Sequence, residues 1–318
     1  MEMRAIFAAE LDRLMAQDER IVVIDADLAK ANGTLSLRQK YPERALDVGV
    51  AEQNMASIAA GLAAYGFIPF ITSFCPFATR RICDQIAISI AYAQRSEKIV
   101  GSDPGIAAEL NGGTHMGVED LGIMRSIPSM VVFEPVDGVQ LRKALPHLVA
   151  YDGPVYMRLF RKERPQLLPD HYQFSFFKAD VLAEGGDVTI AASGIMVEEA
   201  LKARAVLQRQ GIEAEVINVH TLKPLDVQTI LDSVRKTGCI VTAENHNIMG
   251  GLRSAVAEVI GEHFPVPLRS VGIQDVFGQV GRLEELKEVF GLTAENIAAK
   301  AREAIAAKES LPTGGEEA

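Results

Sequence analysis

The chain has 318 residues, which is enough for two domains of ordinary size. Apolar residues make up 48% and charged residues 23%, a globular balance that excludes a disordered or fibrous protein. The formal net charge of −10 argues against a nucleic acid as the main partner, because a phosphate backbone attracts basic surfaces.

The cysteines and the first residues bear on the cellular compartment. Cys75, Cys83 and Cys239 are too few and too scattered for a disulfide framework or a zinc site, which favours a reducing, cytoplasmic setting. Acidic residues recur through residues 1–20, so this segment lacks the continuous apolar run of a signal peptide. Residues 55–79 carry no charge, but their glycines and prolines favour a buried helix, a turn and a buried strand over a membrane-spanning helix.

Short β-branched runs alternate with helical patterns through the first half of the chain. Six runs predict strands, at residues 21–28, 44–50, 68–74, 98–103, 129–135 and 154–160. Helical composition lies between most of them, clearest at residues 78–94 and 137–150. Continuous apolar strands separated by helices predict a mainly parallel sheet covered on both faces.

The alternation lapses after Arg161 and then resumes. Four further strands are predicted at residues 187–193, 212–220, 239–245 and 267–273, with helices between them and a last helix at 294–308. We therefore predict an α/β protein of two domains, residues 1–165 and 186–308, each a mainly parallel sheet covered by helices. Residues 166–185 are predicted to be a linker, and residues 309–318 a flexible acidic tail.

Glu52 is the first candidate for chemistry, because ligands of such sheets bind beyond the carboxyl ends of the strands. It follows a predicted strand and opens an otherwise uncharged helix. One interpretation is a first-turn glutamate that only complements the helix dipole. The other is a carboxyl group at the edge of an apolar pocket, where loss of water favours the form that holds or shares a proton.

Two aromatic residues and two arginines follow the third predicted strand. Phe74 and Phe77 are three residues apart, which is compatible with core packing or with stacking on a flat heteroaromatic ring. Arg80 and Arg81 stand at the start of the next predicted helix, where a cation is unfavourable for the helix dipole. A partner or an anionic ligand would explain them.

A glycine-rich loop follows the fourth predicted strand, and it carries Asn111, Thr114 and His115. Such a loop at the carboxyl end of a strand is typical of a substrate site, although a lone loop histidine is commonly just solvated. The chain has no G-x-G-x-x-G after a strand, no Walker-type loop, no G-x-S-x-G elbow and no His/Cys cluster with metal spacing. The sequence alone therefore predicts half of an active site, without a phosphate cradle or a metal site.

Longer segments resemble a known family. LDVGVAEQNMASIAAGLAAYGFIPFITSFCPFATRRICDQI and SDPGIAAELNGGTHMGVEDLGIMRSIPSMVVFEPVDGVQL resemble the pyrimidine-binding domain of transketolases. INVHTLKPLD and VTAENHNIMGGLRSAVAEVI resemble the C-terminal domain of the same thiamine-diphosphate family. The family's N-terminal diphosphate-binding domain, with its G-D-G…N magnesium motif, has no counterpart here. The chain thus looks like the C-terminal subunit of a split transketolase.

The resemblance implies roles for several residues. Glu52 matches the glutamate that hydrogen-bonds N1′ of the aminopyrimidine and promotes its imino tautomer. Phe74 and Phe77 match the aromatic residues against the pyrimidine ring, and Arg80 falls where transketolases often have tyrosine. His115 matches a histidine that contacts a hydroxyl of the donor sugar near the reacting carbon.

The substrate end of the site departs from the family pattern. Asn111 replaces the usual aspartate that binds a sugar hydroxyl, Ser102 stands where many transketolases have a phosphate-contacting histidine, and Ala31 replaces a serine. Arg161 matches the arginine that binds the substrate phosphate. Loss of phosphate donors while Arg161 remains suggests a substrate that differs from the common ketose phosphates.

The resemblance implies a ketol transfer from a ketose or ketose phosphate to an aldose or aldose phosphate. Thiamine diphosphate would be the cofactor, and Mg²⁺ and the diphosphate would be held by an N-terminal-type partner subunit. An α₂β₂ assembly with a ββ contact around residues 50–95 is expected, without nucleic acid or membrane partners. The alternatives are the β subunit of a 2-oxo acid dehydrogenase E1, a deoxyxylulose-phosphate-synthase-like enzyme, or a non-catalytic cofactor-binding subunit.

Overall fold

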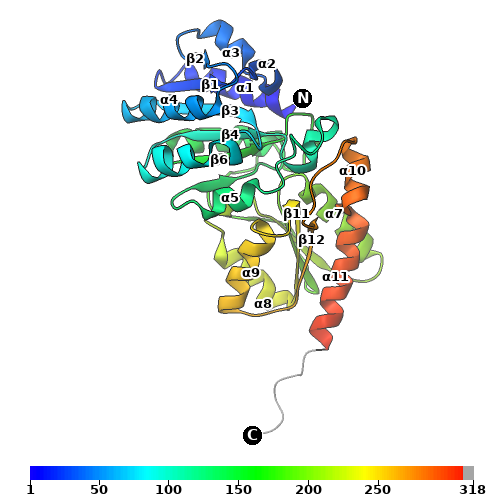
Figure 1. The fold of residues 1–318 in the computed structure, drawn as a ribbon. Coiled ribbons are helices and arrows are strands. Elements are labelled where there is room, and N and C mark those ends of the chain that lie inside the picture. The colour runs from blue at the N-terminus through cyan, green and yellow to red at the C-terminus, as the bar shows by residue number, and fades with distance from the viewer. Residues whose placement is uncertain (311–318) are drawn as a thin grey trace.

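The computed structural model describes residues 1–310, which form two α/β domains stacked on each other (Figure 1). This confirms the predicted fold class. The predicted tail falls mainly on residues 311–318, which lie outside the described residues, whereas Glu309 is the last residue of the final helix.

The first domain contains a seven-stranded sheet in the order β10-β5-β6-β4-β3-β1-β2. Its strands are β1 Ile21–Asp25, β2 Ala45–Asp47, β3 Ile68–Phe74, β4 Lys98–Ser102, β5 Val131–Phe133, β6 Val155–Leu159 and β10 Thr221–Lys223. Its α-helices are α1 Met3–Met15, α2 Ala29–Asn32, α3 Leu35–Lys40, α4 Glu52–Ala64, α5 Asp120–Ser126 and α6 Gly138–Ala150. All neighbouring strands pair in parallel except β10, which is antiparallel to β5.

The second domain contains a five-stranded sheet in the order β12-β11-β8-β9-β7. Its strands are β7 Asp180–Ala183, β8 Val188–Ala192, β9 Ala214–Asn218, β11 Ile240–Asn247 and β12 Leu268–Ile273. Its helices are α7 Met196–Gln208, α8 Val227–Thr237, α9 Leu252–His263, α10 Leu283–Phe290 and α11 Ala294–Glu309. Only β7 runs antiparallel to its neighbour, so this sheet is also mainly parallel.

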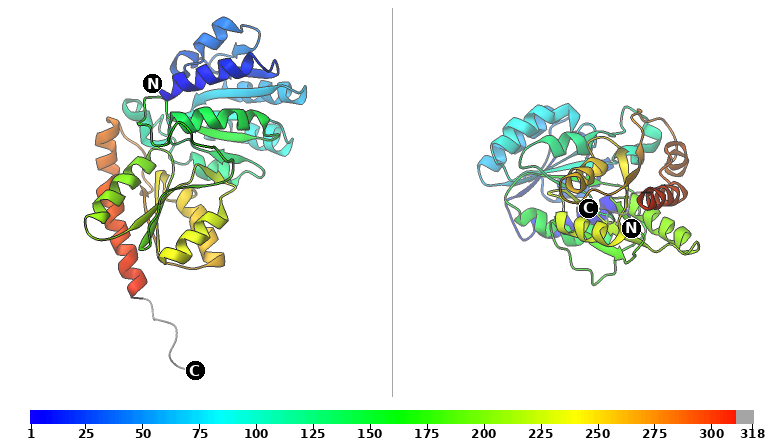
Figure 2. Two further views of the ribbon diagram at one scale, coloured as in Figure 1. Left: turned by 180° about the vertical axis from the view of Figure 1, so that it is seen from behind. Right: turned by 90° about the horizontal axis from the view of Figure 1, so that it is seen from below.

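Helices cover both faces of each sheet, as the continuous apolar strands predict. Seen from behind, α1 and α6 lie in front of the first sheet, and α4 lies on its other face (Figures 1 and 2). One apolar core contains residues of α1, α6, α7 and α11, and a second contains residues of α4, α5, α8 and α9. Each core runs through both domains, so the domains share their packing.

The structure refines several predicted elements. Instead of one α-helix over residues 78–94, a short 3₁₀ turn at Arg80–Ile82 (η1) precedes a π-helix at Gln85–Tyr92 (η2). Strand β7 lies within the segment predicted as a linker. Strand β10 was not predicted. It follows β9 of the second domain in the chain, but it pairs with β5 and so belongs to the first sheet. Within residues 1–310, no helix has the length and apolar character needed to cross a membrane.

A buried ionic cluster joins the two domains. The guanidinium of Arg158 on β6 is fully buried and hydrogen-bonds both oxygens of Asp120 at 2.7 and 2.8 Å. It also contacts Glu134 at 3.1 Å and the backbone oxygen of Asn245 on β11 at 3.1 Å. Desolvation acts to raise the pKa of Asp120, but the adjacent guanidinium outweighs it and lowers that pKa below its usual value. Asp120 is therefore held in its ionised form, and the single guanidinium of Arg158 faces two buried carboxyl groups.

Arg158→Ala is expected to lower the free energy of unfolding by about 3–5 kcal/mol, because two buried carboxylates would lose their cation. Urea denaturation followed by circular dichroism measures the change. Arg235→Ala removes an exposed ion pair of 3.5 Å with Asp232 and is the matched control, expected to change stability little. Equal effects of the two substitutions would contradict the role given to Arg158.

Candidate active site

The predicted site residues lie at the carboxyl edge of the first sheet, at the ends of strands β2, β3, β4 and β6 or just after them. Glu52 opens α4, Phe74 ends β3, and Phe77 and Arg80 follow it. Ser102 ends β4, Asn111 ends the 3₁₀ helix Gly105–Asn111 (η3), and His115 and Arg161 lie in loops.

Glu52 is buried, with 5% of its surface exposed, at the first position of α4. Its Oε1 accepts a hydrogen bond of 2.5 Å from Nη1 of Arg81. The carboxylate is therefore stabilised by two positive sources, the N-terminal end of the helix and one guanidinium. The dipole interpretation and the pocket interpretation of Glu52 are both compatible with this position.

Phe74, Phe77 and His115 form one aromatic cluster. Their ring centroids are 6.1 Å apart for the two phenylalanines, 5.7 Å for Phe74 and His115, and 5.1 Å for Phe77 and His115, all in edge-to-face geometry. All three side chains are only half-buried, so the rings are not core packing. The Nδ1 of His115 lies 2.9 Å from the hydroxyl of Thr114, which orients the ring.

Arg161 contacts the Phe74 end of this cluster, with its guanidinium carbon 4.8 Å from the ring centroid of Phe74. Its Nε donates to Asp103 at 2.6 Å, and its Nη1 donates to the backbone oxygen of Ala31 at 3.2 Å. Burial raises the pKa of the Asp103 carboxyl, while the hydrogen bonds from Arg161 oppose that rise. One anionic partner thus already compensates much of the charge of Arg161.

The side chains of three predicted residues take no part in the aromatic cluster. Ser102 is 1% exposed, and its hydroxyl donates to Asn32 at 2.8 Å within a buried network that includes Asp25. Asn111 is exposed at the end of η3. Arg80 forms an ion pair of 2.7 Å with Glu119. The neighbouring Arg81, rather than Arg80, contacts both Glu52 and Phe77.

The second domain supports the loop that carries His115. The side chain of Asn245 is buried; its Nδ2 donates to the backbone oxygen of Pro104 at 2.9 Å, and its Oδ1 accepts from the backbone nitrogen of Ile106 at 3.0 Å. The backbone nitrogen of Asn247 donates to Val118 at 2.8 Å. Both ends of the loop are therefore held by β11. Sequence reasoning missed this support because no local pattern links positions so far apart.

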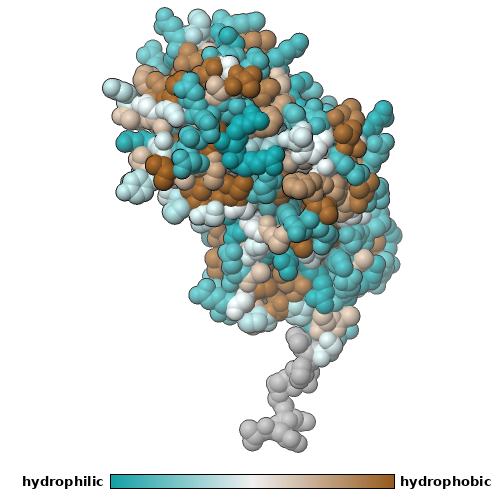
Figure 3. Space-filling view, viewed as in Figure 1, coloured by the Kyte–Doolittle hydropathy of each residue, from teal (hydrophilic) through white to brown (hydrophobic). Residues whose placement is uncertain are grey.

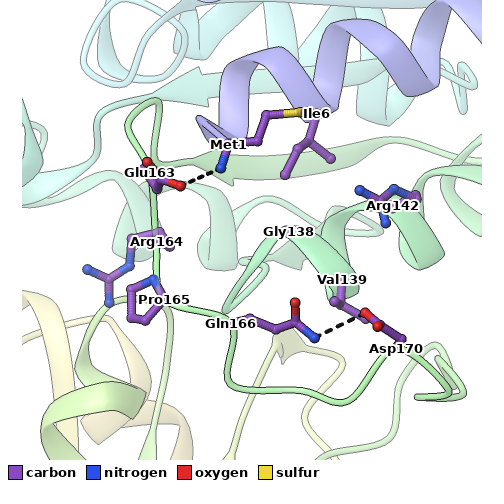
Figure 4. A pocket seen from close by; sticks show the side chains of 10 residues that line it. All are labelled: Met1, Ile6, Gly138, Val139, Arg142, Glu163, Arg164, Pro165, Gln166 and Asp170. Atoms are coloured by element: carbon purple, nitrogen blue, oxygen red, sulfur yellow. Dashed lines mark hydrogen bonds and ion pairs between the residues drawn. The ribbon is translucent and has the colours of Figure 1, made fainter.

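A separate surface pocket of about 600 Å³ lies where α1 meets the start of α6 and the segment after Arg161 (Figure 4). Its lining contains none of the eight predicted site residues. Two of its polar groups already pair with each other, since Gln166 donates to Asp170 at 3.1 Å. We therefore place the candidate active site at the Glu52–His115 edge.

Comparison with known proteins covers both domains. Residues 1–166 match the transketolase pyrimidine-binding domain, and residues 177–297 match the transketolase C-terminal domain. A 6-deoxy-6-sulfo-D-fructose transketolase subunit SqwH from Clostridium sp. (strain MSTE9) is 57% identical over 90% of this chain and 89% of its own length. A 1-deoxy-D-xylulose-5-phosphate synthase 1 from Geobacter sulfurreducens (strain ATCC 51573 / DSM 12127 / PCA) is 37% identical over 95% of this chain. The match covers 48% of the length of that synthase.

A solved structure described as a split-gene transketolase, an inactive β4 tetramer, has the same fold. Its TM-score is 0.90 at 40% sequence identity, and the match covers 97% of this chain and 99% of the other. The two domains, their order and the near-complete coverage of a split relative agree with the resemblance seen in the sequence. The chain therefore belongs to the transketolase family, and it has the pyrimidine-binding and C-terminal domains of a split transketolase subunit.

Proposed function

We propose that this chain is the catalytic C-terminal subunit of a thiamine-diphosphate-dependent transketolase. The enzyme moves a two-carbon ketol unit from a ketose to an aldose. The observation that carries this proposal is the buried carboxylate of Glu52, which faces a guanidinium lying on the flat ring of Phe77. An aminopyrimidine ring requires a carboxyl group that hydrogen-bonds its ring nitrogen and an aromatic side chain that contacts its face.

The residues present fit the pyrimidine end of the cofactor. Glu52 would hold the ring by a hydrogen bond to N1′, and Phe74 and Phe77 would contact its face. Thiamine diphosphate, when bound, supplies the electron sink for breaking and forming a C–C bond next to a carbonyl. Glu52 holds the proton at N1′, and the half-buried aromatic cluster excludes water around it. His115 hydrogen-bonds the donor hydroxyl next to the reacting carbon.

The metal and the diphosphate are held by a partner subunit. Within residues 1–310, no group of three or more His, Cys, Asp or Glu side chains could hold a metal ion. The chain spans about half the length of a one-chain synthase relative but almost the whole of a split relative. The missing half of such a protein is what an N-terminal-type subunit would provide, together with Mg²⁺.

Self-association through α4 and η2 completes the proposed α₂β₂ assembly. These helices pack against each other, and four large apolar side chains on or beside them are exposed: Val50 at 75%, Tyr65 at 88%, Ile88 at 58% and Tyr92 at 84%. Pale and brown residues lie along this side of the first domain (Figure 3). Exposed apolar side chains gathered on one layer are typical of a subunit interface.

The donor is a ketose with a singly charged acidic group at its far end. The relative at 57% identity acts, by its name, on 6-deoxy-6-sulfo-D-fructose. Arg161 offers one guanidinium whose charge Asp103 already compensates, and Ser102 is buried. A site with this one guanidinium suits the single charge of a sulfonate better than the double charge of a phosphate, because a phosphate requires more hydrogen-bond donors.

The proposed reaction is tested with the chain reconstituted with its N-terminal partner, thiamine diphosphate and MgCl₂. Two-carbon exchange between a ketose and an aldose without CO₂ release is expected. With pyruvate or another 2-oxo acid added in place of the ketose, CO₂ release would instead indicate an oxo-acid dehydrogenase or a deoxyxylulose-phosphate-synthase-like enzyme. Glu52→Gln is expected to lower turnover by about a hundredfold or more, because it removes an acid–base group. Glu43→Gln, an exposed residue of the same domain, is the control. Near-normal turnover of Glu52→Gln would favour a non-catalytic subunit.

Donor preference is tested by comparing kcat/KM for 6-sulfo and 6-phospho ketoses. The sulfonated donor is expected to be preferred. Arg161→Gln is expected to lower its kcat/KM by about tenfold to a hundredfold, the usual value of a hydrogen bond to a charged group. A ketose without an acidic group should be affected little. Lys162→Gln, which removes an exposed neighbouring cation, is the control. Equal losses with charged and uncharged donors would refute this role of Arg161.

The interface is tested by placing a charge on η2. Ile88→Glu is expected to halve the mass of the assembled complex in sedimentation, because the charge would have to be buried between two copies. Val289→Glu on α10 starts from the same exposed fraction, 58%, and should leave the mass unchanged. An Ile88→Glu complex of full size would place the contact between copies elsewhere.

A further inference from the structure

Arg81 occupies the part of the candidate site where the proposed function places the aminopyrimidine ring. Its guanidinium carbon lies 3.7 Å from the ring centroid of Phe77, while its Nη1 donates to Oε1 of Glu52 at 2.5 Å. A guanidinium is planar, cationic and lined with N–H donors. One group therefore makes both contacts that a protonated aminopyrimidine would make, stacking on the aromatic face and hydrogen-bonding the carboxylate.

We infer that Arg81 is a placeholder for the aminopyrimidine, which competes with the cofactor for Glu52 and Phe77. This inference rests on the proposed function. Arg81 and the aminopyrimidine cannot stack on the same face of Phe77 at once, because the guanidinium already lies 3.7 Å from the ring centroid of Phe77. Cofactor entry then requires Arg81 to leave, and its departure releases Glu52 from an ion pair.

The location of Arg81 permits this exchange. Its side chain is 42% exposed, whereas that of Glu52 is 5% exposed, so the cation can swing into solvent while the carboxylate stays in place. It belongs to the three-residue turn η1, between the strand that carries Phe74 and the π-helix η2. Departures from α-helical geometry at such a turn are frequent at functional sites. Arg80, one residue earlier, is bound to Glu119 and makes neither contact.

Competition by Arg81 weakens the binding of thiamine diphosphate, and replacing Arg81 should therefore strengthen it. Calorimetric titration of thiamine diphosphate, with MgCl₂ in excess, into the reconstituted complex is expected to show a Kd about fivefold to thirtyfold lower for Arg81→Ala than for the unmodified chain. Arg81→Lys should lie between the two, because an ammonium can pair with Glu52 but cannot stack as a plane. Arg13→Ala, which removes an exposed arginine paired with Glu10 on α1, should leave the Kd unchanged.

A second measurement tests the pyrimidine end of the site in this chain alone, without the diphosphate site of the partner. The free alcohol of the aminopyrimidine, 4-amino-5-hydroxymethyl-2-methylpyrimidine, is titrated into the full chain without its partner and followed by ligand-observed NMR. Tighter binding to Arg81→Ala than to the unmodified chain is expected. The gain should shrink in the Glu52→Gln background, because Arg81 then has no ion pair to give up and only its stacking on Phe77 still competes with the ligand.

The outcomes separate the inference from the function on which it rests. Cofactor binding that Arg81→Ala leaves unchanged or weakens would overturn the placeholder role, while the loss of turnover in Glu52→Gln would still support catalysis. Absence of any thiamine diphosphate binding to the unmodified complex would overturn both.

Discussion

The arrangement of the site depends on one buried guanidinium at the boundary of the two domains. Arg158 pairs with Asp120 and Glu134 and also donates to the backbone oxygen of Asn245. The ionic cluster and the support of the loop therefore meet at the same residue of β11, Asn245. Separating the domains would expose a buried charge network and leave the loop before α5 without its anchor. The second domain carries none of the predicted catalytic residues, yet Asn245 and Asn247 hold the two ends of the loop that bears His115.

Parallel topology explains why residues far apart in the sequence meet. The ends of β2, β3, β4 and β6 point to one edge, and each continues into a loop or a helix start that brings at least one functional group. Glu52 enters as the first residue of an uncharged helix whose other face packs in the core. The same helix and its neighbour η2 leave apolar side chains exposed, so the site and the proposed contact between copies lie on one continuous layer.

The sequence predicted both sheets and all of their strands except β7 and β10, because continuous apolar runs are local signals. It placed Phe74, Phe77 and His115 after predicted strands, but it did not predict that their three rings meet. It did not predict β10, whose three residues add to the sheet of the other domain. Nor could it distinguish Arg80 from Arg81, since only the path of the backbone through a 3₁₀ turn and a π-helix decides which one faces Glu52. Ser102 stands where many transketolases have a histidine, and burial commits its hydroxyl to Asn32.

The proposed division of the active site between two polypeptides creates a charge problem for this chain. A buried carboxylate such as Glu52 is costly to leave without a partner, and a subunit made separately must fold before it meets the cofactor. A nearby arginine on a short, exposed turn solves this problem, because it pairs with the carboxylate and stacks on the adjacent ring until another planar nitrogen group replaces it. In this proposal, the contact that stabilises the free chain also delays cofactor binding until the assembly supplies the diphosphate site. Arg81 therefore has opposite effects on two properties: it stabilises the separate subunit, and it lowers the affinity of the site for the cofactor.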